Sequence, residues 1–237
     1  MNQMNAFLKD KYNMKRFDHV RLNKLLPEIT TENINGKRFY VTPEGNKYPS
    51  VTTVTGLSTA KGIQEWRKRV GEKEANKVSS QASTRGTKVH KLCEDYVNNI
   101  DMDFSDVNPV NLFMFKQIKP ILDTYLEEVF AIECPLYSDY LKVAGRVDCI
   151  GLFKGKPAII DFKTANKRKM RKWIGNYFMQ EAAYAVMFEE MTKIPITQLV
   201  TVIAVTQDEP QLFIERRDDH IAIFQQWRDI YKEKYGV

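Results

Sequence analysis

The chain has 237 residues, of which 43% are hydrophobic and 28% are charged. This length and balance are typical of a folded soluble chain with one sizeable core, and they exclude a disordered or low-complexity protein. The formal net charge of +6 and the pI near 9.0 favour a polyanionic partner such as nucleic acid.

The first half of the chain is predicted to be mainly helical. Phe39-Tyr40-Val41 and the turn residues 42–46 predict a small hairpin that ends near Tyr48. Residues 51–54 either begin a helix capped by Ser50 or remain extended. Helical patterns follow at residues 62–79, at 84–98 with Ser83 or Thr84 as the cap, and at 112–129 with an interruption near Pro120.

The second half alternates between strands and helices. Strands are predicted at 131–137, 142–153, 158–162, 199–206 and 211–216, with helices at 169–191 and 220–235. This order predicts an α/β fold in which helices flank a mixed β-sheet. We expect a mainly helical region over residues 1–128 and a sheet-containing core over 129–237, together forming one compact unit.

The three cysteines, Cys93, Cys134 and Cys149, form no Cys-x-x-Cys pair. Their spacing argues against a zinc ribbon, an iron-sulfur cluster and a disulfide framework, and it is typical of a reducing compartment. The first ten residues contain no apolar run of signal-peptide length, and no later stretch approaches a membrane span. We therefore expect a cytoplasmic protein with no targeting signal and no membrane partner.

Two aspartates and a lysine stand on two adjacent predicted strands. Hairpin pairing across the turn at residues 154–157 would bring Asp148 and Asp161 together. The period of two along a strand points Asp161 and Lys163 to the same face. Mg²⁺ or Mn²⁺ takes hard oxygen ligands, so the two carboxylates can share one ion, with the Phe162 carbonyl as a third ligand.

Lys163 would then lie beside the ion. There it can orient or help deprotonate an attacking water and stabilise charge that develops on a phosphate. The alternative is that Asp161 and Lys163 are solvated surface charges. Ile159, Ile160 and Phe162 favour a buried strand, and with it metal-dependent hydrolysis of a phosphodiester.

Two other segments add polar groups that can join this site. His90 ends the run Arg85-Gly86-Thr87-Lys88-Val89-His90 on the 84–98 helix, and it is either a core histidine or a ligand. Gln180 and Tyr184 lie four residues apart on one helical face, where they either pack or support the site. Glu133 either faces the site or merely begins a strand, and Glu94 either orients His90 or is solvated.

The order of these motifs resembles the RecB-like branch of the PD-(D/E)xK nuclease superfamily. The motifs are Arg-Gly-Thr-x-Val-His, Gly-x-x-Asp, Asp-x-Lys and Gln-x-x-x-Tyr, and the resemblance runs from about residue 48 to 206. Within the branch it is closest to the mitochondrial genome maintenance exonuclease group and its phage and bacterial relatives. Tyr48-Pro49-Ser50-Val51-Thr52-Thr53-Val54 and the arginine-glycine-threonine helix carry that closer likeness.

The resemblance implies a restriction-endonuclease-like core and a Mg²⁺- or Mn²⁺-dependent DNA exonuclease that acts on single strands or frayed ends. In this family pattern His90, Asp148 and Asp161 would bind the metal, and Lys163 would activate the water. Gln180 and Tyr184 would support the site or touch DNA. Replication, recombination, repair and phage degradation of host DNA all remain open as the pathway, and the expected location is the cytoplasm of a bacterial or phage-infected host cell.

The chain departs from some of these relatives in two ways. Relatives with an iron-sulfur cluster need four cysteines, which this chain lacks, so no such cluster is expected. No helicase motif is present, so any unwinding would come from a partner helicase, and a single-strand-binding protein is a second implied partner.

Basic and aromatic residues beside the proposed site are candidates for holding DNA. The cations of the run 167–172 and Trp173 follow Lys163 closely, and Trp173, Tyr177, Gln180 and Tyr184 are expected on one helical face. Trp66 with residues 67–69 forms a second such cluster, and the two segments would shape a passage for a single strand. The alternative is a solvated face. The candidate DNA-binding residues are Arg85, Lys167, Arg168, Arg171 and Trp173.

Three other functions compete with an exonuclease. A flap- or branch-specific endonuclease uses the same chemistry. A nucleic-acid-binding module with an inactive site is disfavoured by the intact Asp148, Asp161 and Lys163. A phosphodiesterase for small nucleotides is disfavoured by the basic-aromatic segments, which a small substrate does not need.

Overall fold

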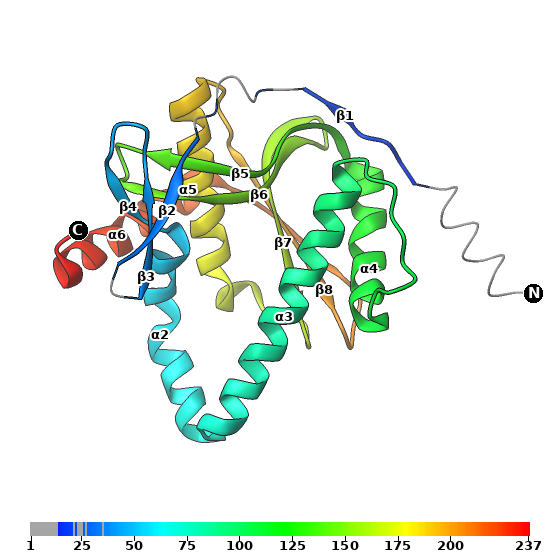
Figure 1. The fold of residues 1–237 in the computed structure, drawn as a ribbon, viewed down its shortest axis with the longest axis horizontal. Helices are drawn as coiled ribbons and strands as arrows, with labels where there is room; N and C mark the ends of the chain where they lie inside the picture. The colour runs from blue at the N-terminus through cyan, green and yellow to red at the C-terminus, as the bar shows by residue number, and fades with distance from the viewer. Residues whose placement is uncertain (1–13, 21, 23–25, 27, 35) are drawn as a thin grey trace, which may run out of the picture.

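A computed structural model describes residues 14–20, 22, 26, 28–34 and 36–237. Its larger sheet has six strands in the order β1-β5-β6-β7-β8-β9 (Figure 1). The strands are β1 (Asp18–His19), β5 (Leu126–Ser138), β6 (Val143–Phe153), β7 (Lys156–Ala165), β8 (Gln198–Val205) and β9 (Gln211–Arg216). Strand β7 pairs parallel with β8, and β6 pairs antiparallel with both of its neighbours, β5 and β7. The expected α/β fold with a mixed sheet flanked by helices is confirmed.

Helices cover both faces of this sheet (Figure 1). One face packs against α3 (Glu72–Val97) and α4 (Pro109–Tyr125), and the other packs against α5 (Gly175–Thr192), with α2 (Val51–Val70) and α6 (Ile221–Tyr235) beside it. A hydrophobic core lies on each face of the sheet, and alternate residues of β7 pack into one or the other. Ile159 packs into the core on the α5 side and Ile160 into the core on the α3 side. This alternation decides which way the polar residues further along β7 can point.

A smaller sheet precedes the helices. It consists of β2 (Thr30–Ile34), β3 (Lys37–Val41) and β4 (Lys47–Pro49), all antiparallel. The Gly45 N–H donates to the Thr42 carbonyl at 2.9 Å and closes the turn between β3 and β4. The predicted hairpin is therefore confirmed, and β2 adds a strand that the sequence pattern did not indicate.

Helix α2 begins at Val51, so the helical interpretation of residues 51–54 is the right one. Ser50 Oγ accepts a hydrogen bond from the Thr53 N–H at 3.1 Å, which satisfies one of the N–H groups left free at a helix start. Val51 and Val54 are fully buried in the α5-side core. The cap and this burial together select the helix.

Helices α2 and α3 form a hairpin that projects from the sheet as a V (Figure 1). The single helix predicted over residues 62–79 is wrong, because Gly71, with φ of 85°, ends α2 and reverses the chain. The cap predicted at Ser83 or Thr84 is also wrong. Both residues lie inside α3, because the polar segment before them continues the helix back to Glu72.

Two further helix boundaries differ from the prediction. Pro120 lies within α4 without interrupting it, since Met114, Ile118 and Leu122 bury the face of the helix, and the chain turns into β5 at Leu126. The helix predicted over 169–191 is wrong at its start. Residues Arg171–Trp173 form a short 3-10 helix, η2, and α5 begins only at Gly175. The helix predicted over 220–235 is observed as α6.

Both large cores draw on each half of the chain. Val51 and Val54 share a cluster with Phe188 of α5, and Val89 and Cys93 share one with residues of β7 and β8. Residues before and after position 128 therefore pack together in both cores.

The three cysteines are free and buried. Among the helices of the described part of the chain, none combines the length and the apolar character that a membrane crossing requires. The first ten residues, on which the expectation of no signal peptide rests, lie outside the described residues.

Candidate active site

The candidate site lies where β6 and β7 separate. Their ladder ends at the pair Cys149–Ile160, and the next residue on each strand is an aspartate, Asp148 on β6 and Asp161 on β7. Beyond that pair the Phe162 N–H has no β6 backbone to bind. It donates instead to Asp148 Oδ2 at 2.9 Å. The end of the ladder thus brings the two carboxylates to one place, as the hairpin predicted.

His90 reaches this place from α3. Its Nδ1 lies 3.3 Å from Asp148 Oδ2, and its ring meets Phe162 edge to face at 6.3 Å between centroids. The neighbouring Val89 and Cys93 are fully buried, so the packing of α3 on the sheet fixes the position of the imidazole. His90 is therefore part of the site rather than a residue of the apolar core.

Lys163 and Asp161 form an ion pair. The lysine Nζ lies 2.6 Å from Asp161 Oδ1 and 2.5 Å from Oδ2. The period of two along β7 places both side chains on one face, as predicted, and this is the α5 face to which Ile159 also belongs. The carboxylate is 3% exposed and the lysine side chain 19% exposed, so both lie in a largely dry environment.

Glu133 also joins the cluster. The pairs Ile132–Cys149 and Cys134–Val147 place it opposite Asp148, and its φ of 47° lies in the left-handed region. For a residue other than glycine that conformation costs about 1–3 kcal/mol, and strained residues of this kind cluster at functional sites. Among the described residues, one group has three metal-ligating atoms within 4.8 Å of one another, and it consists of His90, Glu133 and Asp148.

That trio differs from the one expected from the family pattern, which contained Asp161 in place of Glu133. In the structure the Asp161 carboxylate is engaged by Lys163. Glu94 lies one turn beyond His90 and pairs with Lys91 at 3.1 Å.

Asp148 and His90 shift each other's pKa. Burial opposes the ionisation of Asp148, but His90, Lys163 and the Phe162 N–H outweigh it, so the pKa of Asp148 lies below its usual value. Burial likewise opposes a charge on His90, but Asp148 outweighs it and raises the pKa of the imidazole. The two groups stabilise each other as an ion pair.

The other carboxylates are harder to ionise. Burial, together with repulsion from Asp148, raises the pKa of Asp161 to about 6 in spite of Lys163. Burial and the charges of Asp148 and Glu94 raise the pKa of Glu133. The pKa of Lys163 is also raised, because Asp161 and Asp148 outweigh the effect of its burial, so the lysine keeps its proton.

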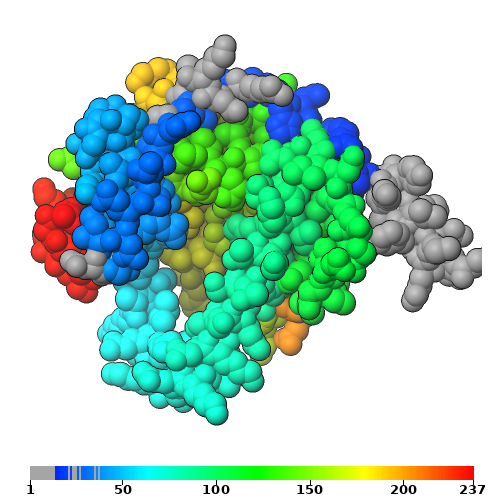
Figure 2. Space-filling view, in the orientation of Figure 1, coloured from blue at the N-terminus to red at the C-terminus, as the bar shows by residue number. Residues whose placement is uncertain are grey.

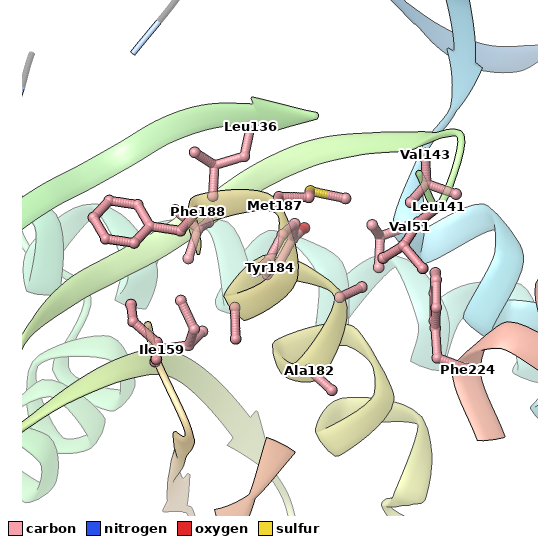
Figure 3. Close-up of a cluster of buried hydrophobic side chains, with 14 of the residues drawn as sticks. Val51, Leu136, Leu141, Val143, Ile159, Ala182, Tyr184, Met187, Phe188 and Phe224 are labelled. Carbon is pink, nitrogen blue, oxygen red and sulfur yellow. The ribbon is translucent and has the colours of Figure 1, made fainter. Parts of the chain in front are cut away.

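Gln180 and Tyr184 lie behind the site rather than on the surface. Both are buried, and Gln180 donates a hydrogen bond to the Tyr184 hydroxyl. Tyr184 is embedded among Val143, Met187 and other apolar side chains of the α5-side core, as Figure 3 shows. Its ring lies against Gly145, the first residue of the Gly-x-x-Asp motif. These positions favour support of the site over contact with DNA.

Sequence reasoning missed Glu181, which is fully buried beside Gln180. Its carboxyl contacts the Thr201 hydroxyl, and Thr201 is the β8 partner of Asp161. Burial, followed by repulsion from Asp161, raises the pKa of Glu181 well above its usual value. A charged residue directly before the run Ala182-Ala183-Tyr184-Ala185 was the signal that could have revealed it.

The basic segment after β7 is only partly available for DNA. Arg171 forms a bidentate pair with Glu215 at 2.6 and 2.5 Å, and Arg168 lies 3.5 Å from Asp208. Trp173 is 63% exposed. It belongs to η2, so the expectation that it shares a face of α5 with Tyr177, Gln180 and Tyr184 is wrong. Lys167 is exposed at the start of this segment.

Arg85 links α3 to the end of β7. Its Nη1 donates to Asn166 Oδ1 at 2.7 Å, and burial lowers the pKa of its guanidinium. A Cβ built on the next residue, Gly86, would lie 4.0 Å from Thr164 Oγ1, so α3 runs close to β7 at this point. Arg85 therefore anchors α3 beside the strand that carries Asp161 and Lys163.

The chain is similar in sequence to two curated exonucleases. It is 26% identical over 132 residues to mitochondrial genome maintenance exonuclease 1 of Mus musculus, a match that covers 52% of this chain and 39% of the mouse protein. The Homo sapiens protein of the same name is 26% identical over 133 residues, covering 52% of this chain and 38% of that protein. The similarity supports a relationship to a nuclease family, although the chain spans about two fifths of the length of these relatives.

No known protein-family profile matches the chain. Among solved structures, the chain resembles a "Putative exonuclease" from Eubacterium rectale with a TM-score of 0.42 and 16% identity. That match covers 65% of this chain and 68% of the other.

Proposed function

We propose that this chain is a metal-dependent nuclease of the RecB-like PD-(D/E)xK type that hydrolyses phosphodiester bonds of DNA. The observation that carries the proposal is the meeting of His90, Asp148, Asp161 and Lys163 where β6 and β7 separate. Helix α3 supplies His90, and the β6–β7 hairpin supplies the other three groups. A histidine, two carboxylates and a lysine with shifted pKa values at one strand end meet the criteria for a candidate catalytic centre.

The donor set fits Mg²⁺ or Mn²⁺. His90, Glu133 and Asp148 offer an imidazole and two carboxylates within 4.8 Å of one another, and the raised pKa of Glu133 reflects burial and negative charge that a cation would offset. Asp161 is the fourth candidate ligand. The Phe162 carbonyl is the fifth, because in a strand it faces the same side as the Phe162 N–H, toward Asp148. A bound ion would polarise the phosphate and acidify a water ligand.

Lys163 would then act on the attacking water and on the phosphate. Because it keeps its proton beside Asp161, we assign it to donating hydrogen bonds rather than to taking a proton. Asp161 would orient the lysine through their ion pair, in which Nζ lies 2.6 Å from Oδ1.

The α2–α3 hairpin supports a preference for free single-stranded ends. Figure 2 shows a hollow in the surface between α2 and α3, and α3 is the helix that carries His90. Arg67, Lys68 and Arg69 lie in the last turn of α2, and Trp173 is exposed on the segment after β7. A strand passing between these basic and aromatic groups would enter by its end, which is the physical basis for exonuclease action.

The first experiment tests the catalytic groups. Asp161→Asn and Lys163→Ala should each abolish cleavage of single-stranded DNA in Mg²⁺, while DNA binding measured by fluorescence anisotropy stays within about threefold. Lys154→Ala, in the turn at the other end of β7, is the matched control and should leave cleavage unchanged. Full activity in either site variant would refute the proposal.

The second experiment tests the substrate. Linear single strands should be degraded in Mg²⁺, and covalently closed circles of the same sequence should not. Efficient cutting of circles would favour an endonuclease, and flapped or branched duplexes would then identify a structure-specific one. Binding without cleavage of any substrate would favour an inactive binding module. For activity on duplex DNA, we expect that a helicase or a single-strand-binding protein supplies the single strand.

A further inference from the structure

Lys163 has a second neighbour besides Asp161. Its Nζ lies over the ring of Tyr177, 5.2 Å from the centroid, on the first turn of α5. We propose that Tyr177 is a positioning residue for the catalytic lysine, holding the ammonium against Asp161 by a cation–π contact. This inference rests on the proposed function, in which Lys163 acts on the attacking water.

A lysine at this position needs a second support. Its four-carbon stem has many rotamers, and the ion pair with Asp161 restrains it from one direction only. A metal ion coordinated by the Asp161 oxygens would weaken the ion pair that restrains Lys163. The face of an aromatic ring attracts the ammonium without taking its proton, so this contact can hold Lys163 in place while it stays charged.

The ring of Tyr177 is itself well anchored. It packs against a buried cluster formed by Ala165, Ile174, Phe178, Ile203 and Val205. The Tyr177 N–H also donates to the Ile174 carbonyl at 2.9 Å. Phe178 contacts Phe213 and His220, with centroids 6.0 and 5.1 Å away. Because β7, β8 and β9 all contribute to this packing, the ring is a fixed surface rather than a mobile side chain.

Stacking on a DNA base is the alternative role for Tyr177. The structure favours the lysine contact, because Tyr177 is half-buried and Lys163 lies over its ring. Trp173, four residues earlier and 63% exposed, is better placed to stack on a base. The two roles affect different kinetic constants: positioning the lysine acts on kcat, and stacking acts on KM.

The kinetic test compares Tyr177→Phe with Tyr177→Leu on linear single-stranded DNA in Mg²⁺. The phenylalanine keeps the ring face and should stay within about threefold of the parent kcat, whereas leucine should lower kcat roughly tenfold with KM unchanged. Tyr235→Leu is the matched control, because it removes a ring at 5.4 Å from Lys234 at the far end of the chain. It should leave both constants unchanged. A rise in KM for Tyr177→Leu at constant kcat would overturn the proposal.

A second measurement, by NMR, detects the contact between Lys163 and Tyr177 independently of nuclease activity. In protein labelled with ¹³C at the lysine ε position, the signal that disappears in Lys163→Arg identifies Lys163. The Tyr177 ring current should shift this signal upfield of the other lysines, and the shift should persist in Tyr177→Phe and vanish in Tyr177→Leu. An unshifted Lys163 signal in the parent protein would overturn the proposal, whatever the variants do. Full activity of Lys163→Ala would instead refute the proposed function, because the ring-current shift does not depend on cleavage.

Discussion

The ring of Tyr184 occupies the space in which a side chain at Gly145 would begin. A Cβ built on Gly145 would lie 2.7 Å from Tyr184 Cε1 and 2.8 Å from its hydroxyl oxygen. Gly145 begins the Gly-x-x-Asp motif and Tyr184 ends the Gln-x-x-x-Tyr motif. These two motifs are therefore one packing unit, which joins α5 to the strand that carries Asp148.

Gly145→Ala should destabilise the fold. The methyl group would overlap a buried ring that has little room to move, and overpacking of this kind costs about 1–3 kcal/mol. Urea unfolding should show this loss for Gly145→Ala. It should show none for Gly62→Ala, a control in helix α2 where a Cβ meets nothing within 4 Å. Adding Tyr184→Leu to Gly145→Ala should recover part of the lost stability, and strict additivity of the two changes would contradict the packing unit.

Glu133→Gln should weaken metal binding. The amide keeps the shape of the side chain but removes a charge from the group formed with His90 and Asp148, so Mn²⁺ affinity should fall roughly tenfold or more. Isothermal titration calorimetry measures the change directly. Glu94→Gln is the control and should stay within about threefold, since Glu94 pairs with Lys91 outside that group. Equal effects of the two substitutions on Mn²⁺ affinity would contradict the assignment of Glu133 as a metal ligand.

The thermal stabilisation caused by Mg²⁺ should be larger at about pH 7 than at about pH 5, because ligands must lose their protons to bind a metal. The pKa of Asp161 is raised to about 6, and the pKa of His90 is raised as well, so protons compete with the ion across this window. Differential scanning fluorimetry with and without Mg²⁺ measures the shift in Tm. A shift independent of pH would exclude both groups as ligands.

In the metal-free protein, the raised pKa of Asp161 should make stability fall as the pH rises, whereas the stabilisation by Mg²⁺ should increase with pH. The folded state holds the Asp161 proton more tightly than the unfolded state, whose carboxyl has the ordinary pKa of 3.8. The contribution of Asp161 to stability should therefore fall as the pH rises from about 4 to about 6. In Asp161→Asn, this part of the pH dependence should be missing.

Lys172→Ala should lower the salt dependence of DNA binding more than Arg171→Ala. Arg171 is already paired with Glu215, whereas Lys172 lies over the exposed Trp173 ring with its Nζ 5.6 Å from the centroid. Loss of one phosphate contact reduces the slope of log K against log salt by about 1. Anisotropy titrations over a series of salt concentrations give the slopes. A larger effect of Arg171→Ala would mean that Arg171 leaves Glu215 to bind DNA.

Several features of the site followed from the sequence, because they depend on short-range periodicity. The period of two places Asp161 and Lys163 on one face of β7, and the turn after β6 brings Asp148 beside them. The helical period places Gln180 and Tyr184 on one face of α5. Local geometry of this kind is set by residues within a few positions of one another.

Other features were decided only by the tertiary structure. Glu133 joins the cluster from a point of β5 at which its backbone is left-handed. Arg171 is paired with Glu215, a residue 44 positions away in the chain, and is therefore less available to DNA. Tyr177 meets Lys163 only because α5 starts at Gly175, after a break that the helical pattern concealed. The sequence by itself determined which groups the chain offers and which of them share a strand or a helix face. Packing between distant segments decided which of them meet, because long-range contacts depend on how helices and strands dock, and no local pattern encodes that docking.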